Sequence, residues 1–183
     1  PGIPLLAEAL RAGGYETVCA VANPQLSGVT GLDAGFDTVL ECFGAPGSGS
    51  EWKGDGVEVL GRLRGWLEGR GGPAGAKPLF LFVNLMETHL PYTFDSRDLA
   101  AIRGDGAVNG ARRAAALVTD ERASAHLHGI DPIDEATIRD LGAAYDGAVR
   151  TVDRVTGEIL DLLGRQGLLG NAVVAVCGDH GEN

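Results

Sequence analysis

The sequence predicts an α/β fold: a mostly parallel central sheet with helices on both faces. Three short apolar runs have the β-branched and aromatic composition of buried strands, at residues 17–22, 79–86 and 171–177. Apolar residues at helical spacing fill residues 134–165, between the last two runs. A strand, a helix and a strand in this order form a right-handed crossover between parallel strands. The composition, 44% hydrophobic and 22% charged over 183 residues, is that of a globular domain.

The first part of the chain is expected to form a helix and two strands. Residues 4–12 carry Leu and Ala at helical spacing, and a pair of glycines then ends the helix. The run 17–22 is a buried strand that ends at Asn23 and Pro24, because the residue before a proline is driven out of the helical region. Residues 37–43 predict a second strand.

Two loops, a helix and a strand are expected next. The loops cover residues 44–50 and 69–77, which are rich in Gly, Ser and Pro. Between them, apolar residues at spacings of three and four predict a helix over residues 57–67. The run 79–86 is the most apolar stretch of the chain, which predicts a central strand of a covered sheet.

The second half of the chain ends in a long helix and a last strand. Residues 94–130 give a weak signal and are interpreted as an insertion, although the Ala- and Arg-rich residues 109–126 predict a helix. Residues 134–165 predict one long helix with acids near its start and Arg165 at its end, which suits the helix dipole. The run 171–177 then predicts a buried strand.

The charge and the cysteines narrow the possible partners. A formal net charge of −10 argues against a nucleic acid or an anionic membrane surface, since these partners need clustered Lys and Arg. Because the chain is acidic, a small anionic substrate would need a cation at the binding site. No apolar run reaches the length of a membrane span. Cys19, Cys42 and Cys177 form no C-x-x-C pair and no disulfide framework, so reduced, buried thiols are expected.

A candidate site lies where the last strand is predicted to end. Asp179 and His180 follow it directly, and ligands of α/β sheets collect beyond the carboxyl ends of strands. A carboxylate beside an imidazole suits a divalent cation; a capping Asp and a surface His are the alternative. His89 follows the run 79–86, so it is expected at the same edge if the two strands are parallel.

Five segments in order carry the motifs of one family. They are Leu5–Thr17, a helix-then-strand entry ending in Tyr15-Glu16-Thr17; Gly35-Phe36-Asp37; Phe80–Tyr92, which ends in His89-Leu90-Pro91-Tyr92; the helix positions Tyr145, Val152, Asp153 and Gly157; and Gly178-Asp179-His180-Gly181-Glu182. Together they resemble the sulfatase branch of the alkaline-phosphatase-like superfamily. The resemblance spans nearly the whole chain.

The resemblance implies a role for each candidate residue. Asp179 and His180 correspond to ligands of the catalytic divalent cation, for which calcium is expected first and manganese, magnesium or zinc are alternatives. His89 corresponds to a histidine that contacts the sulfuryl group or the leaving oxygen. Asn23 lies where many members have a Lys that helps to hold the nucleophile and the anion. It is kept as a substrate-binding candidate, with turn or cap chemistry as the alternative.

The nucleophile that the family uses does not occur in this sequence. Sulfatases oxidise a Cys or Ser in C/S-x-P-x-R to formylglycine, and related phosphatases use Ser or Thr. The residues that follow Cys19, Cys42 and Cys177 do not fit that motif. Residues 1–183 are therefore expected to be a partial catalytic domain, with an insertion at 94–130 and the formylglycine nucleophile outside this chain.

The implied activity is the metal-dependent hydrolysis of a small sulfate monoester. A phosphomonoesterase, a phosphodiesterase or a phosphonate monoester hydrolase of the same superfamily is the alternative, because an Asp-His pair serves those reactions too. A non-catalytic fragment that keeps the fold is the alternative from another class.

Overall fold

The computed structural model describes four stretches of the chain: residues 3–28, 30–44, 54–70 and 77–181. The chain separates into two compact units. Unit 1 consists of Pro1–Met86 and Glu158–Val174, and unit 2 of Glu87–Gly157 and Ala175–Asn183. The loops predicted at 44–50 and 69–77 lie largely outside the described stretches. Within those stretches, no helix is long and apolar enough to cross a membrane.

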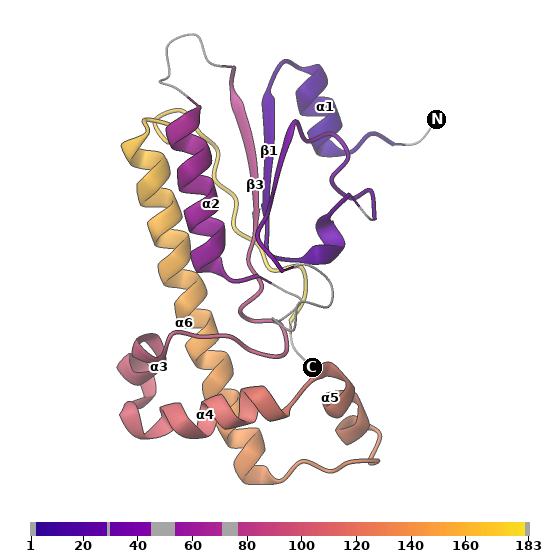
Figure 1. Cartoon of the computed structure of the whole chain (residues 1–183), viewed down its shortest axis with the longest axis vertical. Helices are drawn as coiled ribbons and strands as arrows, with labels where there is room; N and C mark the ends of the chain where they lie inside the picture. Colours follow the sequence, from indigo (N-terminus) through magenta and orange to yellow (C-terminus); the bar gives the residue numbers. More distant parts are fainter. Residues whose placement is uncertain (1–2, 29, 45–53, 71–76, 182–183) are drawn as a thin grey trace. The chain divides into compact units, whose positions relative to one another are not determined.

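Unit 1 is built on a parallel sheet. Its strands are β1 (Glu16–Val21), β2 (Thr38–Glu41) and β3 (Leu79–Asn84), in the order β2-β1-β3, and both pairings are parallel. Figure 1 shows α1 (Leu6–Ala12) and α2 (Gly56–Gly69) on opposite sides of this sheet. The α/β class with a parallel sheet and helices on both faces is confirmed.

Two predictions about the strands of the sheet are wrong. Residues 171–177 form no strand: they carry no ladder to a neighbour, and Val173 and Val176 are 99% and 77% exposed. The run 79–86 is not central, because β3 pairs with β1 on one side and no described strand pairs with its other edge. Apolar β-branched residues favour a strand, but they do not supply the neighbour with which a strand must pair.

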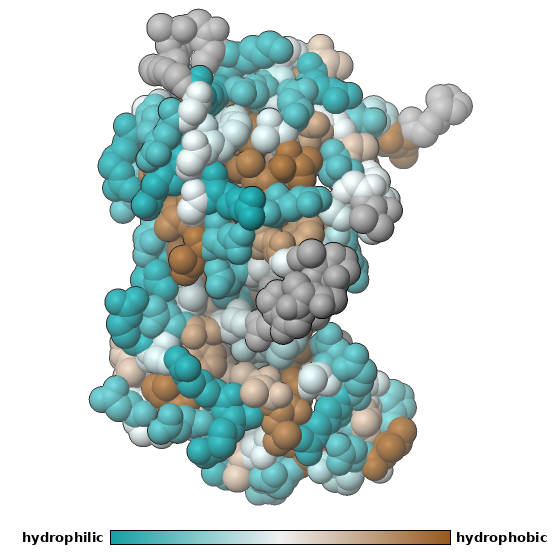
Figure 2. Space-filling view, viewed as in Figure 1, coloured by the Kyte–Doolittle hydropathy of each residue, from teal (hydrophilic) through white to brown (hydrophobic). Residues whose placement is uncertain are grey.

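Apolar side chains form the core of unit 1 and also reach its surface. The face of α2 that contacts β1 carries Val59 and Leu63, both fully buried. Brown, apolar atoms are nevertheless exposed over the strands of the sheet in Figure 2. The rings of Phe36 and Phe80 stack with their centroids 5.8 Å apart, and Phe82 on β3 is exposed. β3 is only half-buried along its length.

Two of the family-like motifs meet at the start of β1. The hydroxyl of the buried Thr17 donates to the carbonyl oxygen of Gly35 at 2.9 Å, and the backbone N–H of Thr17 donates to Asp37 Oδ2 at 3.1 Å. The backbone N–H of Asp37 donates back to Thr17 Oγ1 at 2.9 Å. The hydrogen bond from Thr17 holds the pKa of the Asp37 carboxyl below its ordinary value. These motif residues join β1 to the turn before β2, which is a structural role.

Unit 2 is helical. Its helices are α3 (Ser96–Arg103), α4 (Asp105–Leu117), α5 (Asp120–Leu127) and the part of α6 (Glu135–Arg165) that ends at Gly157. The helix predicted over 134–165 is confirmed as α6. The segment interpreted as an insertion forms α3, α4 and α5, and one catalytic domain over residues 1–183 stays a prediction.

The helical prediction over residues 109–126 is confirmed except at Val118 and Thr119, which separate α4 from α5. Thr119 is the N-cap of α5, and its side chain accepts from the N–H of Arg122 at 3.4 Å. The prediction rested on the high helix propensity of Ala and Arg and overlooked this cap. The core of unit 2 uses small residues where helices approach closely: Ala111, Ala115, Ala143, Ala144 and Ala148, together with Leu99 and Tyr92.

The three cysteines differ in exposure. Cys19 on β1 and Cys42 after β2 are buried, and burial raises the pKa of their thiols to about 12 and about 11. Cys177 is exposed, which corrects the expectation of three buried thiols. It lies in a stretch after α6 that forms no strand.

Iodoacetamide is expected to label Cys177 in the native protein and to leave Cys19 and Cys42 unmodified. The two buried thiols stay protonated at neutral pH, and the thiolate is the reactive form. Mass spectrometry of a digest would locate the label, with labelling in urea as the control in which all three react. Native modification of Cys19 or Cys42 at the rate of Cys177 would contradict the buried positions.

Candidate active site

His89 lies in a short loop that follows β3. The backbone N–H of Thr93 donates to the carbonyl oxygen of Glu87 at 3.2 Å, which closes the loop around His89. The ring is half-buried, and its Nδ1 lies 2.6 Å from the carbonyl oxygen of Leu90. A backbone contact of the ring itself therefore orients the imidazole.

Asp179 and His180 lie on the surface of unit 2. The side chain of Asp179 is 92% exposed and that of His180 is 61% exposed. The backbone N–H of His180 donates to Asp179 Oδ1 at 3.0 Å, and Nδ1 of its ring lies 2.8 Å from the carbonyl oxygen of Gly181. His180 Nε2 is 3.9 Å from Asp179 Oδ1.

The structure brings the two histidines together. The ring centroids of His89 and His180 are 6.5 Å apart, in an edge-to-face arrangement at 72°. Both residues belong to unit 2. The prediction placed them side by side at the ends of two parallel strands. They do meet, but the pairing of those strands is not the reason, because the second strand does not form.

Both histidine rings use Nδ1 in the same way. A carbonyl oxygen can only accept, so Nδ1 of His89 and Nδ1 of His180 must carry the proton in these contacts. In the neutral ring, Nε2 then carries the lone pair. This tautomer, held by a backbone carbonyl, is typical of histidines that bind a metal or exchange a proton through Nε2.

Asp179 and His180 together fit part of a divalent-cation site. Two atoms that bind one ion lie roughly 3–4.5 Å apart, because each lies about 2.0–2.6 Å from the ion. The distance of 3.9 Å between Asp179 Oδ1 and His180 Nε2 falls in that range. Among the described residues, no group of three or more His, Cys, Asp and Glu side chains gathers as a metal site. Glu182, the second acidic residue of the same motif, lies outside the described stretches.

Asn23 lies in unit 1, at the carboxyl end of β1. Its side chain caps the 3₁₀ turn Pro24–Leu26 by accepting from the N–H of Gln25 at 2.9 Å. Its backbone N–H donates to Asn84 Oδ1 at 3.0 Å, which ties the ends of β1 and β3 together. These contacts support the turn interpretation. A substrate-binding role for Asn23 stays a prediction.

A pair of tyrosines beside His89 was not predicted from the sequence. Tyr92, three residues after His89, packs its ring against that of Tyr145 on α6, with centroids 5.3 Å apart at 63°. The two rings line a shallow hollow of about 310 Å³ together with Leu141 and Gly142. Both tyrosines belong to the family-like motifs, which was the only signal in the sequence that could have paired them.

The chain matches the model of a known protein family. The family model described as Sulfatase matches residues 2–183. No curated protein and no solved structure matches the chain.

Proposed function

Since the chain belongs to the sulfatase family, we propose that it acts in the hydrolysis of a small sulfate monoester, with His89, Asp179 and His180 at the ester. One observation carries the proposal beyond the family. Two residues far apart in the sequence, His89 and His180, have their rings 6.5 Å apart, and each directs Nδ1 to a backbone carbonyl oxygen.

The chemistry needs residues of these types. Hydrolysis of the ester builds negative charge on the attacking, leaving and peripheral oxygens, so catalysis depends on positioning and on electrostatic stabilisation. With Nδ1–H held by the Leu90 carbonyl, His89 would donate a hydrogen bond or a proton from Nε2 to the leaving oxygen or to the sulfuryl group when both of its ring nitrogens are protonated. Asp179 and His180 would hold the divalent cation, with calcium first and manganese, magnesium or zinc as alternatives. Such an ion supplies positive charge to the ester oxygens and lowers the pKa of an oxygen nucleophile.

The nucleophile is proposed to lie outside these residues. No Cys or Ser of the chain stands in the C/S-x-P-x-R motif. Cys19 and Cys42 are unsuited to attack, because they are buried and their thiols have raised pKa values. We therefore expect a formylglycine on another segment of the protein, and no turnover by residues 1–183 alone.

An assay with matched esters tests the proposal. Aryl sulfate and aryl phosphate would be offered, with calcium, manganese, magnesium or zinc, to residues 1–183 and to the protein that carries their flanking sequence. We expect the longer protein to hydrolyse the sulfate. Preference for the phosphate would favour the phosphatase alternative. Turnover by residues 1–183 alone would contradict the position of the nucleophile, and no turnover by either protein would favour the non-catalytic alternative.

His89→Ala is expected to lower kcat by about 10²–10⁴-fold with a smaller change in KM, as for the loss of a transition-state contact. Steady-state kinetics of the active protein would measure both constants. His128→Ala is the matched control, since the Nδ1 of His128 also contacts a backbone carbonyl, that of Ser124, at 2.7 Å. An unchanged kcat in His89→Ala would leave His89 as a residue that only shapes the loop.

A further inference from the structure

The segment between β3 and α3, which carries His89, contacts α6 at three places. The ring of Tyr92 packs against Tyr145. Phe94 lies directly on the backbone at Gly147, where a Cβ would be only 3.1 Å from Phe94 Cγ. One turn further along α6, the hydroxyl oxygen of Thr151 accepts from the backbone N–H of Asp95 at 3.0 Å. The last of these contacts is the polar one, and it fixes the end of the loop.

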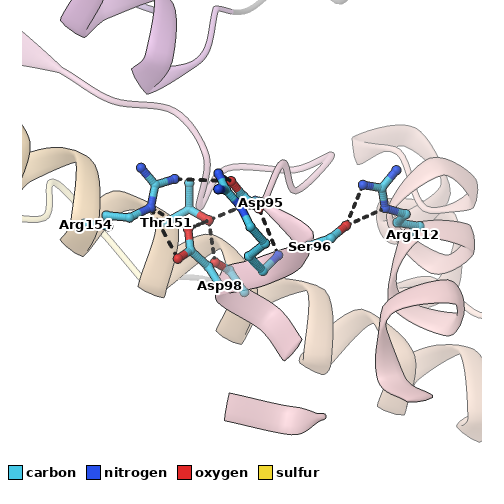
Figure 3. Close-up of polar contacts among 8 residues, drawn as sticks. Asp95, Ser96, Asp98, Arg112, Thr151 and Arg154 are labelled. Carbon is cyan, nitrogen blue, oxygen red and sulfur yellow. Dashed lines mark hydrogen bonds and ion pairs between the residues drawn. The ribbon is translucent and has the colours of Figure 1, made fainter. Parts of the chain in front are cut away.

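The Thr151 hydroxyl is held in place from its other side. It is buried, and its proton faces two acceptors, Gly147 O at 2.9 Å and Asp98 Oδ2 at 3.1 Å. The buried Asp98 carboxylate in turn accepts from Arg154 Nε at 2.9 Å. Figure 3 shows Thr151 between Asp95, Asp98 and Arg154. The hydroxyl proton is therefore directed at these acceptors, and the oxygen presents a lone pair to the N–H of Asp95.

Asp95 joins the loop to α3. It is the N-cap of α3, and its Oδ1 accepts from the N–H of Arg97 at 2.8 Å. Hydrogen bonds from Arg97, with the nearby Arg154, lower the pKa of Asp95 to about 2, so the carboxylate is ionised at neutral pH. The carboxylate caps α3, whereas the backbone N–H of the same residue donates to the Thr151 hydroxyl oxygen. Capping of the helix alone does not require the contact with α6.

We propose that Thr151 is a positioning residue for His89 and acts through the backbone of Asp95, an inference that rests on the proposed function. A misplacement of about 1 Å in a reacting group costs on the order of 100-fold in rate. His89 lies six residues before Asp95 in the segment between β3 and α3, so loss of the contact at Asp95 is expected to move the imidazole. Asp98 and Arg154 act one step further away, because they orient the Thr151 hydroxyl.

Thr151→Val removes the hydroxyl and keeps the shape of the side chain, whereas Thr151→Ser keeps the hydroxyl. In the active protein, we expect Thr151→Val to lower kcat by about 10–100-fold with little change in KM. Thr151→Ser is expected to keep kcat and KM close to those of the wild type. Thr137→Val is the control on the same helix, since the Thr137 hydroxyl contacts Asp134 rather than the loop. If Val does not fold, Thr151→Ala serves the same comparison.

NMR of the imidazole of His89 tests the positioning without any turnover. In the 183-residue chain, the ring signals of His89, assigned with a His89→Gln variant, are expected to shift in Thr151→Val and not in Thr151→Ser or Thr137→Val. Shifted signals without hydrolysis would keep the positioning role and remove the proposed function. Unmoved His89 signals in a folded Thr151→Val protein, or equal effects of Val and Ser, would overturn the inference.

Discussion

Asp179→Ala and His180→Ala are each expected to abolish metal-dependent hydrolysis, with losses of more than about 100-fold. Replacement of a residue that only supports a metal ligand already lowers metal affinity or activity by about 10–100-fold, so replacement of a ligand itself should lower them more. The two donor atoms, Asp179 Oδ1 and His180 Nε2, lie 3.9 Å apart on an exposed stretch. Removal of either donor leaves a single protein ligand of this pair for the ion.

Conservative replacements separate binding of the ion from folding. Asp179→Asn keeps an oxygen donor without the charge, and His180→Asn keeps a neutral donor, so both are expected to retain more metal than the Ala variants. Metal content would be measured by elemental analysis and calcium affinity by titration calorimetry, beside the rate. Wild-type metal content and rate in both Ala variants would remove the ligand assignment.

Gly35→Ala is expected to destabilise unit 1 by roughly 2–5 kcal/mol, a large part of the 5–15 kcal/mol typical of a domain. Gly35 has φ of +92°, where a Cβ is strained. That Cβ would also lie 2.4 Å from the backbone nitrogen of Glu8 on α1, which cannot move without shifting the helix. The carbonyl oxygen of Gly35 accepts from Thr17, so the damage reaches the start of β1.

Gly14→Ala is the matched control for this strain. Gly14 has nearly the same φ, +90°, but no atom lies within 4 Å of the position that a Cβ would take, so the variant should lose only about 1–2 kcal/mol. Urea unfolding followed by tryptophan fluorescence reports on unit 1, since Trp66 lies on α2. Equal losses in the two variants would show that the contact with α1 has no cost of its own.

Local patterns in the sequence predicted the elements whose structure is local. The 3.6-residue spacing of apolar residues over 134–165 predicted α6 to within one residue of its start. The apolar run 17–22 predicted β1, and the spacing over 57–67 predicted α2. The break between α4 and α5 was missed, although Thr119 is a cap residue that the sequence displays.

The errors concern partners that lie far away in the chain. Residues 171–177 have the composition of a strand, but a strand exists only where a second strand offers its backbone hydrogen bonds. For the same reason, the apolarity of β3 did not reveal that it lies at an edge of the described sheet. Composition describes what a segment can bury, whereas pairing depends on what the folded chain places beside it.

The sequence by itself determined the family, the α/β class and the identity of the candidate groups, His89, Asp179 and His180. Those properties reside in residue types and in their order along the chain. Only the tertiary structure decided that the rings of His89 and His180 meet, that both direct Nδ1 to a carbonyl, and that Thr151 holds the loop. Such contacts join residues distant in sequence, and their distances and orientations depend on the packing of the loop against α6.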